Sequence, residues 1–264
     1  MELRTEKMIA DKAQGIGWMT FNQPERRNAI SHEMREAILT ILDDFEADPE
    51  VRVIVMRGAG DKAFVSGSDI SRGEKGAATP AELERQGKLS ALVQERYASL
   101  AKPLIAMIRG YCLGGGVATA LYADLRIASE DAQFGVPAAL LGNAYNWDYT
   151  RMLVDAVGAS RAKEILITAR RYAAEEALAI GLIHQVVPGD RLEETVRKTA
   201  AMIAANAPLS VIAAKAMVNE VIKDPADRDM DKVRALRKAC LESNDFREGR
   251  RAFNEKREPQ WTGT

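Results

Sequence analysis

The chain has 264 residues, which is long enough for one large domain, or a domain with a helical appendage, around a sizeable core. With 37 basic and 38 acidic side chains the net charge is −1, so no basic field favours nucleic acid, and no apolar run reaches the ~18 residues of a membrane span. Two cysteines, two histidines and a charged N-terminus argue against a disulfide framework, a multi-histidine metal site and a signal peptide, and predict a cytoplasmic protein without a membrane partner.

The N-terminal part of the chain alternates between predicted strands and a helix. Met8–Lys12 and Ile16–Phe21, separated by a Gln-Gly pair, have the pattern of a β-hairpin. After a loop, Ser31 is placed to cap a helix over His32–Ala47. The β-branched run Val51–Arg57 predicts a buried strand. Strands that alternate with helices predict an α/β protein.

The segment Lys62–Ile70, with the sequence KAFVSGSDI, has on composition alone the character of a polar turn after a strand. The following residues, Arg72–Pro80, are rich in glycine, alanine and charge, which predicts a mobile segment. Glu82–Leu100 then has the amphipathic pattern of a helix. This helix leads to the most informative stretch of the sequence.

Three consecutive glycines, Gly114–Gly116, separate a predicted buried strand, Leu104–Ile108, from a predicted helix, Val117–Ala123. The first N–H groups of a helix have no intrahelical acceptor, and with the helix dipole they suit a developing negative charge. Glycine also lets a substrate carbonyl approach the backbone closely. Alternatively, the glycines only let helix and strand pack tightly, and the triplet alone favours neither interpretation.

The rest of the chain changes from a mixed pattern to a helical one. In the mixed part, two short strands are predicted over Asp124–Ala128 and Ala132–Pro137, and a helix near Trp147 follows them. Two further helices are predicted over Ala159–Thr168 and Tyr172–Gly181, and a last strand over His184–Val187. Four helices without strands follow, over Arg191–Asn206, Leu209–Ile222, Lys232–Glu242 and Asp245–Lys256. We therefore predict a mixed core over residues 1–190 and a helical module over residues 191–264.

The motifs GYCLGGG, ADLRIAS and AQFGVP occur in this order around the glycine triplet. Together they resemble the crotonase superfamily, the enoyl-CoA hydratases and isomerases, and the resemblance runs from Asn22 to Lys256. It implies a spiral of ββα repeats and a C-terminal helical module that builds a homotrimer, or a hexamer as a dimer of trimers. It also implies an acyl-CoA substrate, with coenzyme A carried by the thioester and no permanently bound cofactor or metal.

The shared step of this family is polarisation of a coenzyme A thioester carbonyl, in which charge moves onto the oxygen as an enolate or a related oxyanion forms. The resemblance implies that the backbone N–H groups of Ser68 and Gly115 oppose this charge. The family usually has alanine where this chain has Ser68. Because the donor belongs to the main chain, a serine retains it.

Both glutamates that a hydratase of this family uses to activate water are absent. Ala118 and Ala138 stand at their places, and alanine transfers no proton. Tyr145 is one replacement, because the LG-x-x-Tyr-Asn arrangement resembles methylmalonyl-CoA decarboxylase, where a tyrosine faces the substrate carboxylate. Loss of carbon dioxide yields the enolate without a base. Asp148 is a second replacement, unless it only caps the following helix.

Two groups of residues are implied in coenzyme A binding by the same resemblance. Those near the nucleotide come from a loop and from the motif after it, and they are Arg26, Arg27, Asn28, Ser66, Asp69 and Ile70. Near the other end of the chain, Phe253 and Lys256 match a phenylalanine and a lysine that reach the cofactor of a neighbouring subunit. The alternative for the charged side chains is a solvated surface position.

The sequence thus predicts an acyl-CoA enzyme of this family, a lyase or an isomerase, that stabilises a thioester enolate or oxyanion with backbone N–H groups. Two alternatives stay open. One is a decarboxylase of malonyl-type thioesters that uses Tyr145, and the other is a catalytically silent acyl-CoA binder. The sequence does not specify the acyl group, the pathway, or the choice between trimer and hexamer.

Overall fold

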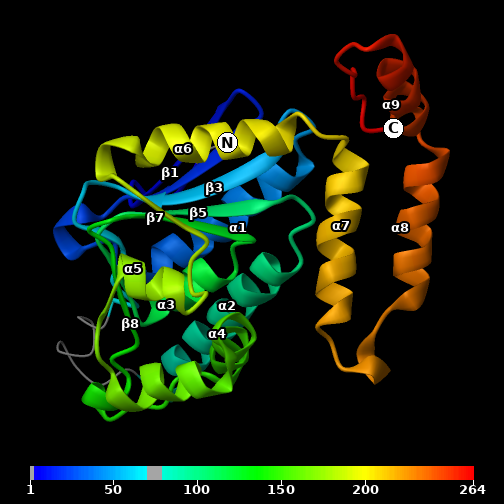
Figure 1. Ribbon diagram of the computed structural model, residues 1–264. Coiled ribbons are helices and arrows are strands. Elements are labelled where there is room, and N and C mark those ends of the chain that lie inside the picture. The colour runs from blue at the N-terminus through cyan, green and yellow to red at the C-terminus, as the bar shows by residue number, and fades with distance from the viewer. Residues whose placement is uncertain (1–2, 70–78) are drawn as a thin grey trace.

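The computed structural model describes residues 3–69 and 79–264, so Ile70, one of the predicted coenzyme A contacts, lies outside the described residues. The strands are β1 (Met8–Ala13), β2 (Ile16–Phe21), β3 (Val53–Gly58), β4 (Ala63–Val65), β5 (Leu104–Ile108), β6 (Tyr111–Leu113), β7 (Leu125–Ser129), β8 (Gln133–Gly135), β9 (Tyr172–Ala173) and β10 (Gln185–Val187). The α-helices are α1 (His32–Ala47), α2 (Pro80–Ala98), α3 (Gly115–Leu121), α4 (Trp147–Thr168), α5 (Ala174–Ala179), α6 (Leu192–Ala204), α7 (Pro208–Val221), α8 (Met230–Glu242) and α9 (Asn244–Glu255). Figure 1 shows a mixed core with α7 and α8 standing beside it, which confirms the predicted α/β class.

The larger sheet has six strands in the order β1-β2-β3-β5-β7-β10. β1 and β2 form the predicted antiparallel hairpin, and the strands from β2 to β10 pair in parallel. Side chains alternate between two apolar clusters. Trp18 packs with Val53 and Val55 on one face, and Met19 and Phe21 pack on the other. The sheet is therefore buried on both faces, as parallel strands usually are.

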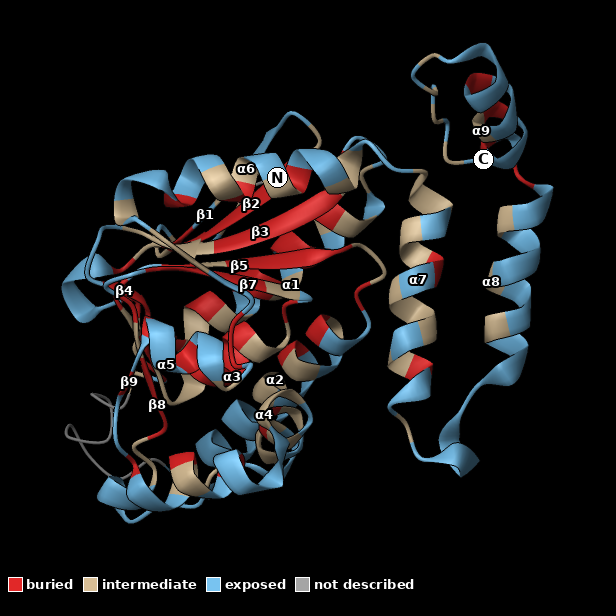
Figure 2. Ribbon diagram, in the orientation of Figure 1, coloured by how far each residue is buried: buried red, intermediate tan, exposed pale blue. Residues whose placement is uncertain are grey.

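Helix α6 covers one face of this sheet. Leu192, Val196 and Ala200 recur every four residues, and all three are buried in the cluster that contains Trp18 and Val53. Figure 2 shows buried segments of α6 along the strands. The boundary predicted at residue 190 therefore places α6 in the helical module, although α6 packs on the sheet of the core. The helices that stand apart from the sheet begin only with α7.

The smaller sheet has the order β4-β6-β8-β9. β4, β6 and β8 run parallel, and β9 is antiparallel to β8. The sequence analysis did not predict β6, because its three residues lie between Gly110 and the glycine triplet and show no periodicity. It also began the helix now seen as α5 at Tyr172, which instead pairs with Phe134 of β8. The parallel pairing brings the chain after β4 and the chain after β6 to the same sheet edge.

Tight packing, one of the two interpretations of the glycine triplet, holds for Gly116. Gly114 has φ 53°, a left-handed value that glycine adopts most easily. A Cβ atom on Gly116 would lie 2.0 Å from the carbonyl oxygen of Val65, so α3 packs backbone against backbone on β4. Gly115, between them, lies beside Ser68, and its role as an anion donor stays a prediction.

Helix α4 spans the two segments that were predicted as separate helices. Gly158 interrupts it with φ 76° and ψ 158°, so the break falls directly before Ala159, where the second helix was predicted to start. At the start of α4, Asn146 is the N-cap, and its Oδ1 accepts from the Asp148 N–H at 2.8 Å. Asp148 therefore does not cap this helix, and its carboxylate is left for another role.

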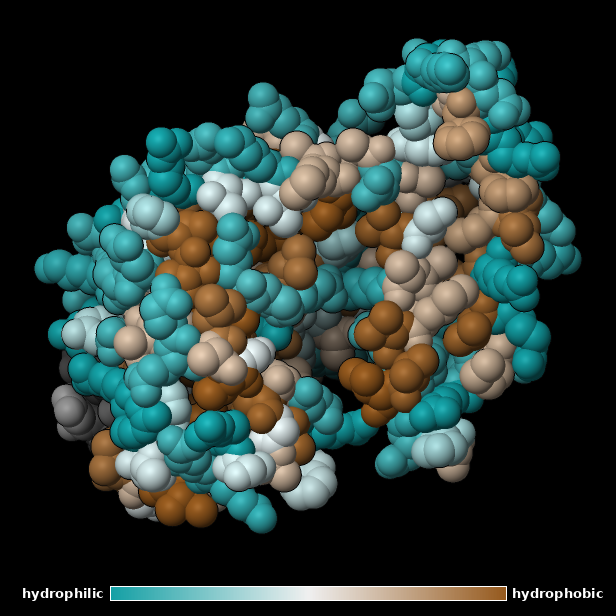
Figure 3. All heavy atoms as spheres, in the orientation of Figure 1, coloured by the Kyte–Doolittle hydropathy of each residue, from teal (hydrophilic) through white to brown (hydrophobic). Residues whose placement is uncertain are grey.

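The C-terminal helices touch the core at few places. Lys215 of α7 donates to Asp124 Oδ2 at 2.8 Å and to the Lys102 carbonyl at 3.0 Å. In α9, Asp245 accepts from the N–H groups of Thr262 and Gly263, which holds the tail against the helix. Helix α8 has no buried residue among those described. Figure 3 shows hydrophobic atoms over α7 and α8, and the exposed apolar side chains there include Val218, Val221, Ile222, Met230 and Leu241.

We expect Gly116→Ala to lower the free energy of unfolding by at least about 1–3 kcal/mol, because backbone atoms of Val65 occupy the place of the new methyl group. Gly87→Ala in α2 is the matched control. No atom lies within 4 Å of its Cβ position, so replacing glycine inside this helix should raise stability by about 0.5–1 kcal/mol. Urea unfolding measures both values. Equal midpoints for the two variants would contradict close packing of α3 on β4.

Candidate active site

The backbone N–H of Ser68 points away from the contact that holds its loop. Ile30 and Ser68 form a parallel bridge, in which the Ile30 N–H donates to the Gly67 carbonyl at 2.8 Å and the Asp69 N–H donates to the Ile30 carbonyl at 3.0 Å. In such a bridge the N–H of the central residue faces the opposite side. Among the described residues, no acceptor takes the Ser68 N–H.

The N–H of Gly115 borders the same space. Gly115 is the first residue of α3, so no helical turn provides its acceptor. The Gly114 N–H donates to the Gly135 carbonyl at 2.8 Å, which fixes the turn before it. A Cβ atom on Gly115 would lie 3.4 Å from Ser68 N, and one on Gly67 would lie 3.8 Å from Gly115 N. Ser68 and Gly115 are therefore neighbours across this turn, and each has a backbone N–H for which no acceptor is found among the described residues.

Only methyl groups stand at the two positions where the resemblance implies glutamates. Ala118, in α3, is 2% exposed, and its N–H donates to the Gly114 carbonyl at 3.2 Å. Ala138 follows Pro137 and precedes a 3-10 turn, and it packs partly buried against the apolar core. Neither side chain carries a proton, so acid or base catalysis at this space depends on another group.

Tyr145 lies at the glycine turn, and its hydroxyl proton is used by the backbone. The hydroxyl donates to the Gly114 carbonyl at 3.1 Å. Burial raises the pKa of Tyr145, so it remains a neutral phenol. Its ring lies 5.6 Å from the ring of Tyr149, centroid to centroid. Tyr145 therefore supports the turn that presents the Gly115 N–H.

Asp148 is exposed in the first turn of α4, one residue before Tyr149. Burial raises the pKa of Tyr149 and of Tyr122, and the charge of Asp148 adds to both shifts. The carboxylate thus lies near the aromatic side chains of α3 and α4. It is a candidate proton acceptor at the rim of the site.

Arg35 is a charged residue of the site that the sequence analysis missed. Its Nη2 donates to the Ser68 Oγ at 3.1 Å. Burial lowers the pKa of Arg35, and the neighbouring Tyr149 partly offsets this shift. The signal was present in the sequence, because Arg35 lies three and seven residues before Ile38 and Leu42, which are buried. An arginine at that spacing flanks the apolar face of α1.

The loop at residues 24–28 joins the Ser66–Asp69 loop through its backbone. The Ser66 N–H donates to the Arg27 carbonyl at 3.1 Å, and the Ser66 hydroxyl donates to the Arg26 carbonyl at 3.5 Å. Arg26 Nη1 lies 3.5 Å from Asp69 Oδ1. The structure therefore brings together Arg26, Ser66 and Asp69, three of the residues implied in coenzyme A binding.

The next two residues of this loop point elsewhere. The Arg27 guanidinium lies over the ring of Tyr111, 5.2 Å from its centroid. The Asn28 side chain is fully buried and donates to the carbonyls of Ala59 and Ala63, at 3.0 and 2.7 Å. It also accepts from the Gln23 N–H at 2.9 Å. The Asn28 amide group therefore stabilises the loop through hydrogen bonds within the chain.

Phe253 and Lys256 lie at the end of α9, away from the loop at residues 24–28 (Figure 1). Phe253 is 84% exposed, and Lys256 ends the helix with φ 54°. One chain therefore does not bring these two residues to its own predicted coenzyme A contacts. A role at the site of a neighbouring subunit stays a prediction.

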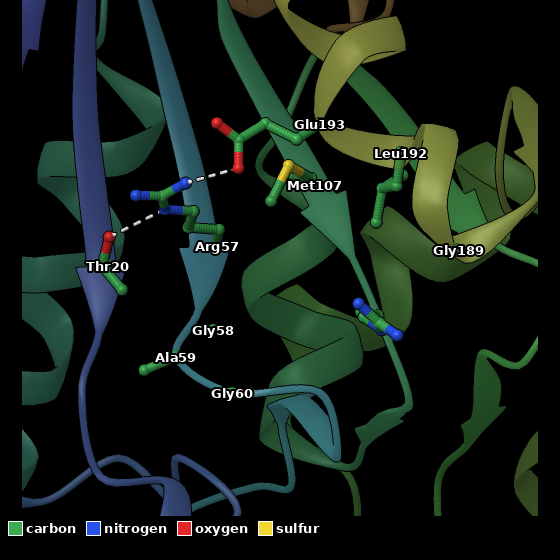
Figure 4. A pocket seen from close by; sticks show the side chains of 10 residues that line it. Thr20, Arg57, Gly58, Ala59, Gly60, Met107, Gly189, Leu192 and Glu193 are labelled. Carbon is green, nitrogen blue, oxygen red and sulfur yellow. Dashed lines mark hydrogen bonds and ion pairs between the residues drawn. The ribbon is translucent and has the colours of Figure 1, made fainter.

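A separate pocket of about 330 Å³ opens at the carboxyl ends of β2, β3 and β5 (Figure 4). In it, Arg57 donates to Thr20 Oγ1 at 3.1 Å and pairs with Glu193 of α6 at 3.3 Å. None of the predicted site residues lines this pocket. Arg57 and Glu193 in this pocket neutralise each other as an ion pair. The N–H groups of Ser68 and Gly115 therefore remain the better candidate site.

Residues 3–69 and 79–264 show neither a metal centre nor a single helix that could span a membrane. In these ranges no group of three or more His, Cys, Asp or Glu side chains is placed to hold a metal ion. No single helix in them is long and apolar enough to cross a membrane. The pair formed by residues 189–204 and α7 passes that test only jointly, with a bend of 104°.

The similarity to known proteins extends over nearly the whole chain. The family profile described as "Enoyl-CoA hydratase/isomerase" matches residues 11–264. A short-chain-enoyl-CoA hydratase from Clostridium acetobutylicum is 34% identical over 257 residues, 97% of each chain. A crotonyl-CoA hydratase from Syntrophomonas wolfei is 34% identical over 256 residues, 96% of each chain. The crystal structure of a putative enoyl-CoA hydratase/isomerase family protein from Hyphomonas neptunium matches with a TM-score of 0.91 and 37% identity over 98% of each chain.

Proposed function

Because the chain belongs to the enoyl-CoA hydratase/isomerase family, we propose that it binds the carbonyl oxygen of an acyl-CoA thioester between the N–H groups of Ser68 and Gly115. The observation that carries this proposal is the space that both groups border, where Ser68 N lies 3.4 Å from the Cβ position of Gly115. As an enolate forms, charge develops on that oxygen. One such donor is typically worth ~3 kcal/mol of barrier.

The chain differs from a hydratase in the groups that would transfer protons. Ala118 and Ala138 replace the two glutamates, so activation of water at those positions is lost. Asp148 is the proposed substitute, because its carboxylate is exposed and acts on the pKa of Tyr149 in the aromatic wall. Each general acid or base is worth about 10²- to 10⁴-fold. Ordinary hydration should therefore be slow.

A decarboxylase of malonyl-type thioesters is the second candidate. The methyl groups at positions 118 and 138 favour it, because loss of carbon dioxide forms the enolate without a base. The hydroxyl of Tyr145 already donates to the Gly114 carbonyl, so a substrate carboxylate would have to displace that bond. This requirement makes decarboxylation the weaker of the two candidates.

Coenzyme A should lie over the joined loops that carry Arg26, Ser66 and Asp69. We propose that Phe253 and Lys256 complete the site of a neighbouring subunit, because both lie far from these loops in their own chain (Figure 1). The exposed apolar side chains of α7 and α8 support assembly, since isolated proteins rarely leave such patches open. A homotrimer, alone or in pairs, is the proposed assembly.

A β-keto thioester tests the two donors without any catalytic base, because it ionises to an enolate that absorbs in the near ultraviolet. Acetoacetyl-CoA bound to the protein should ionise at least ~1 pH unit below the free ester, since N–H donors stabilise the anion. Gly115→Ala retains the N–H but fills the space with a methyl group, so the shift should vanish. Gly87→Ala should preserve it. Binding without any shift would support the silent acyl-CoA binder instead.

The missing carboxylates are tested by restoring them. The natural protein should hydrate crotonyl-CoA feebly, and Ala118→Glu with Ala138→Glu should raise the rate by about 10²-fold or more, measured as loss of enoyl absorbance. The matched control, Ala118→Gln with Ala138→Gln, adds the same bulk without an acid and should give no gain. Release of carbon dioxide from methylmalonyl-CoA, measured in parallel, would favour the second candidate. Rapid hydration by the natural protein would assign activation of water to Asp148.

The assembly is tested by light scattering of the purified protein. The mass should be three times that of the chain or a multiple of it, because α8 buries no side chain among the residues described in one chain. Val218→Asp and Val221→Asp place charges on the exposed apolar surface of α7 and should shift the mass towards the monomer. A natural protein that is monomeric at micromolar concentration would contradict the proposed assembly.

A further inference from the structure

Arg35 is a cation of the candidate site that has no carboxylate in ion-pair distance among residues 3–69 and 79–264. Its guanidinium donates to the neutral Ser68 hydroxyl at 3.1 Å. Arg35 is half-buried on the inner flank of α1, so water solvates its charge incompletely. Arg96, another half-buried arginine, pairs with Asp43 and Glu46, and the more deeply buried Arg126 donates to the Leu182 and Ala123 carbonyls. A partly buried guanidinium gains most from a carboxylate that arrives with a ligand.

The groups around Arg35 leave the position of its counter-ion to a ligand. Tyr149 faces Arg35 as a neutral phenol, because burial raises the pKa of the tyrosine more than Arg35 lowers it. Asp148 acts on Tyr149, but among the described residues it forms no ion pair with Arg35. The side chains shown to contact or face Arg35 are thus the neutral hydroxyl of Ser68 and the neutral phenol of Tyr149.

The position of Arg35 relates it to the acyl group rather than to the nucleotide. Ser68 provides the proposed carbonyl donor with its N–H and accepts from Arg35 with its hydroxyl. The same Oγ atom lies 3.5 Å from the Cβ position of Gly115. The guanidinium therefore borders the space where the thioester carbonyl would be held.

We propose that Arg35 binds a free carboxylate on the acyl group, so that the substrates are coenzyme A thioesters of dicarboxylic acids. This inference rests on the proposed acyl-CoA function and adds the chemical class of the acyl chain. The carboxylate remains in the product. An ion pair with a carboxylate that leaves as carbon dioxide would stabilise the ground state more than the transition state and would slow the reaction.

The test compares glutaryl-CoA with pentanoyl-CoA, which have the same number of acyl carbons and differ in a terminal carboxylate. Isothermal titration calorimetry should show that the natural protein binds glutaryl-CoA about 10- to 100-fold more tightly, the usual range for a charged hydrogen bond. Arg35→Gln should remove this preference, so that glutaryl-CoA and pentanoyl-CoA bind with similar affinity. Arg35→Lys, which retains the charge, should keep part of the preference.

Arg161→Gln is the matched control, because it removes an exposed arginine of α4 beyond the break at Gly158 and should leave the preference intact. Equal affinity of the natural protein for both esters would overturn the inference and leave the acyl-CoA function standing. So would an Arg35→Gln variant in which both esters weaken equally, since Arg35 would then hold coenzyme A or the Ser68 loop. Failure of both esters to bind the natural protein would overturn the acyl-CoA function itself.

Discussion

The parallel pairing of β4 with β6 is the constraint on which the candidate site depends. It places the chain after Val65 beside the chain after Leu113, and the close approach of Gly116 to the Val65 carbonyl sets their separation. Contacts between backbone atoms have no rotamers through which to relax. The positions of the Ser68 and Gly115 N–H groups are therefore set by the fold. Under the proposed function this would be preorganisation, which makes backbone donors effective against a developing charge.

Local signals predicted most elements of the fold. Ser31 caps α1 as expected, with its Oγ accepting from the Met34 N–H, and the apolar runs became the buried strands of the six-stranded sheet. The misses have a common physical cause. β6 and β9 are too short to show a period, and they exist because longer neighbours offer them hydrogen bonds. The place of α6 on the sheet likewise depends on tertiary packing, since its amphipathic pattern does not identify its partner.

The residues of the candidate site also fall into those that the sequence indicated and those that only the structure revealed. The family resemblance implied Gly115 and Ser68 as backbone donors, and their action on a ligand stays a prediction. Arg35 was not predicted, because its contact with Ser68 joins residues 33 positions apart and no local rule relates α1 to the loop after β4. The Asn28 side chain shows the opposite error. A polar residue in a binding loop was assigned to a ligand, and the structure uses all of its hydrogen bonds to hold the loop itself.

The break in α4 divides the helix into two segments that are anchored separately. The segment before Gly158 carries Asp148 and Tyr149 and is anchored in the core by Leu153, and the segment after it is anchored by Ala162 and Ile165. No atom lies within 4 Å of the Cβ position of Gly158, so the break is not imposed by a neighbouring element. Each segment therefore keeps its own position on the core when exposed residues of the other are changed. Under the proposed function, substitutions among the exposed residues around Asp148 would alter which acyl group fits, while the packing of α3 on β4 stays unchanged.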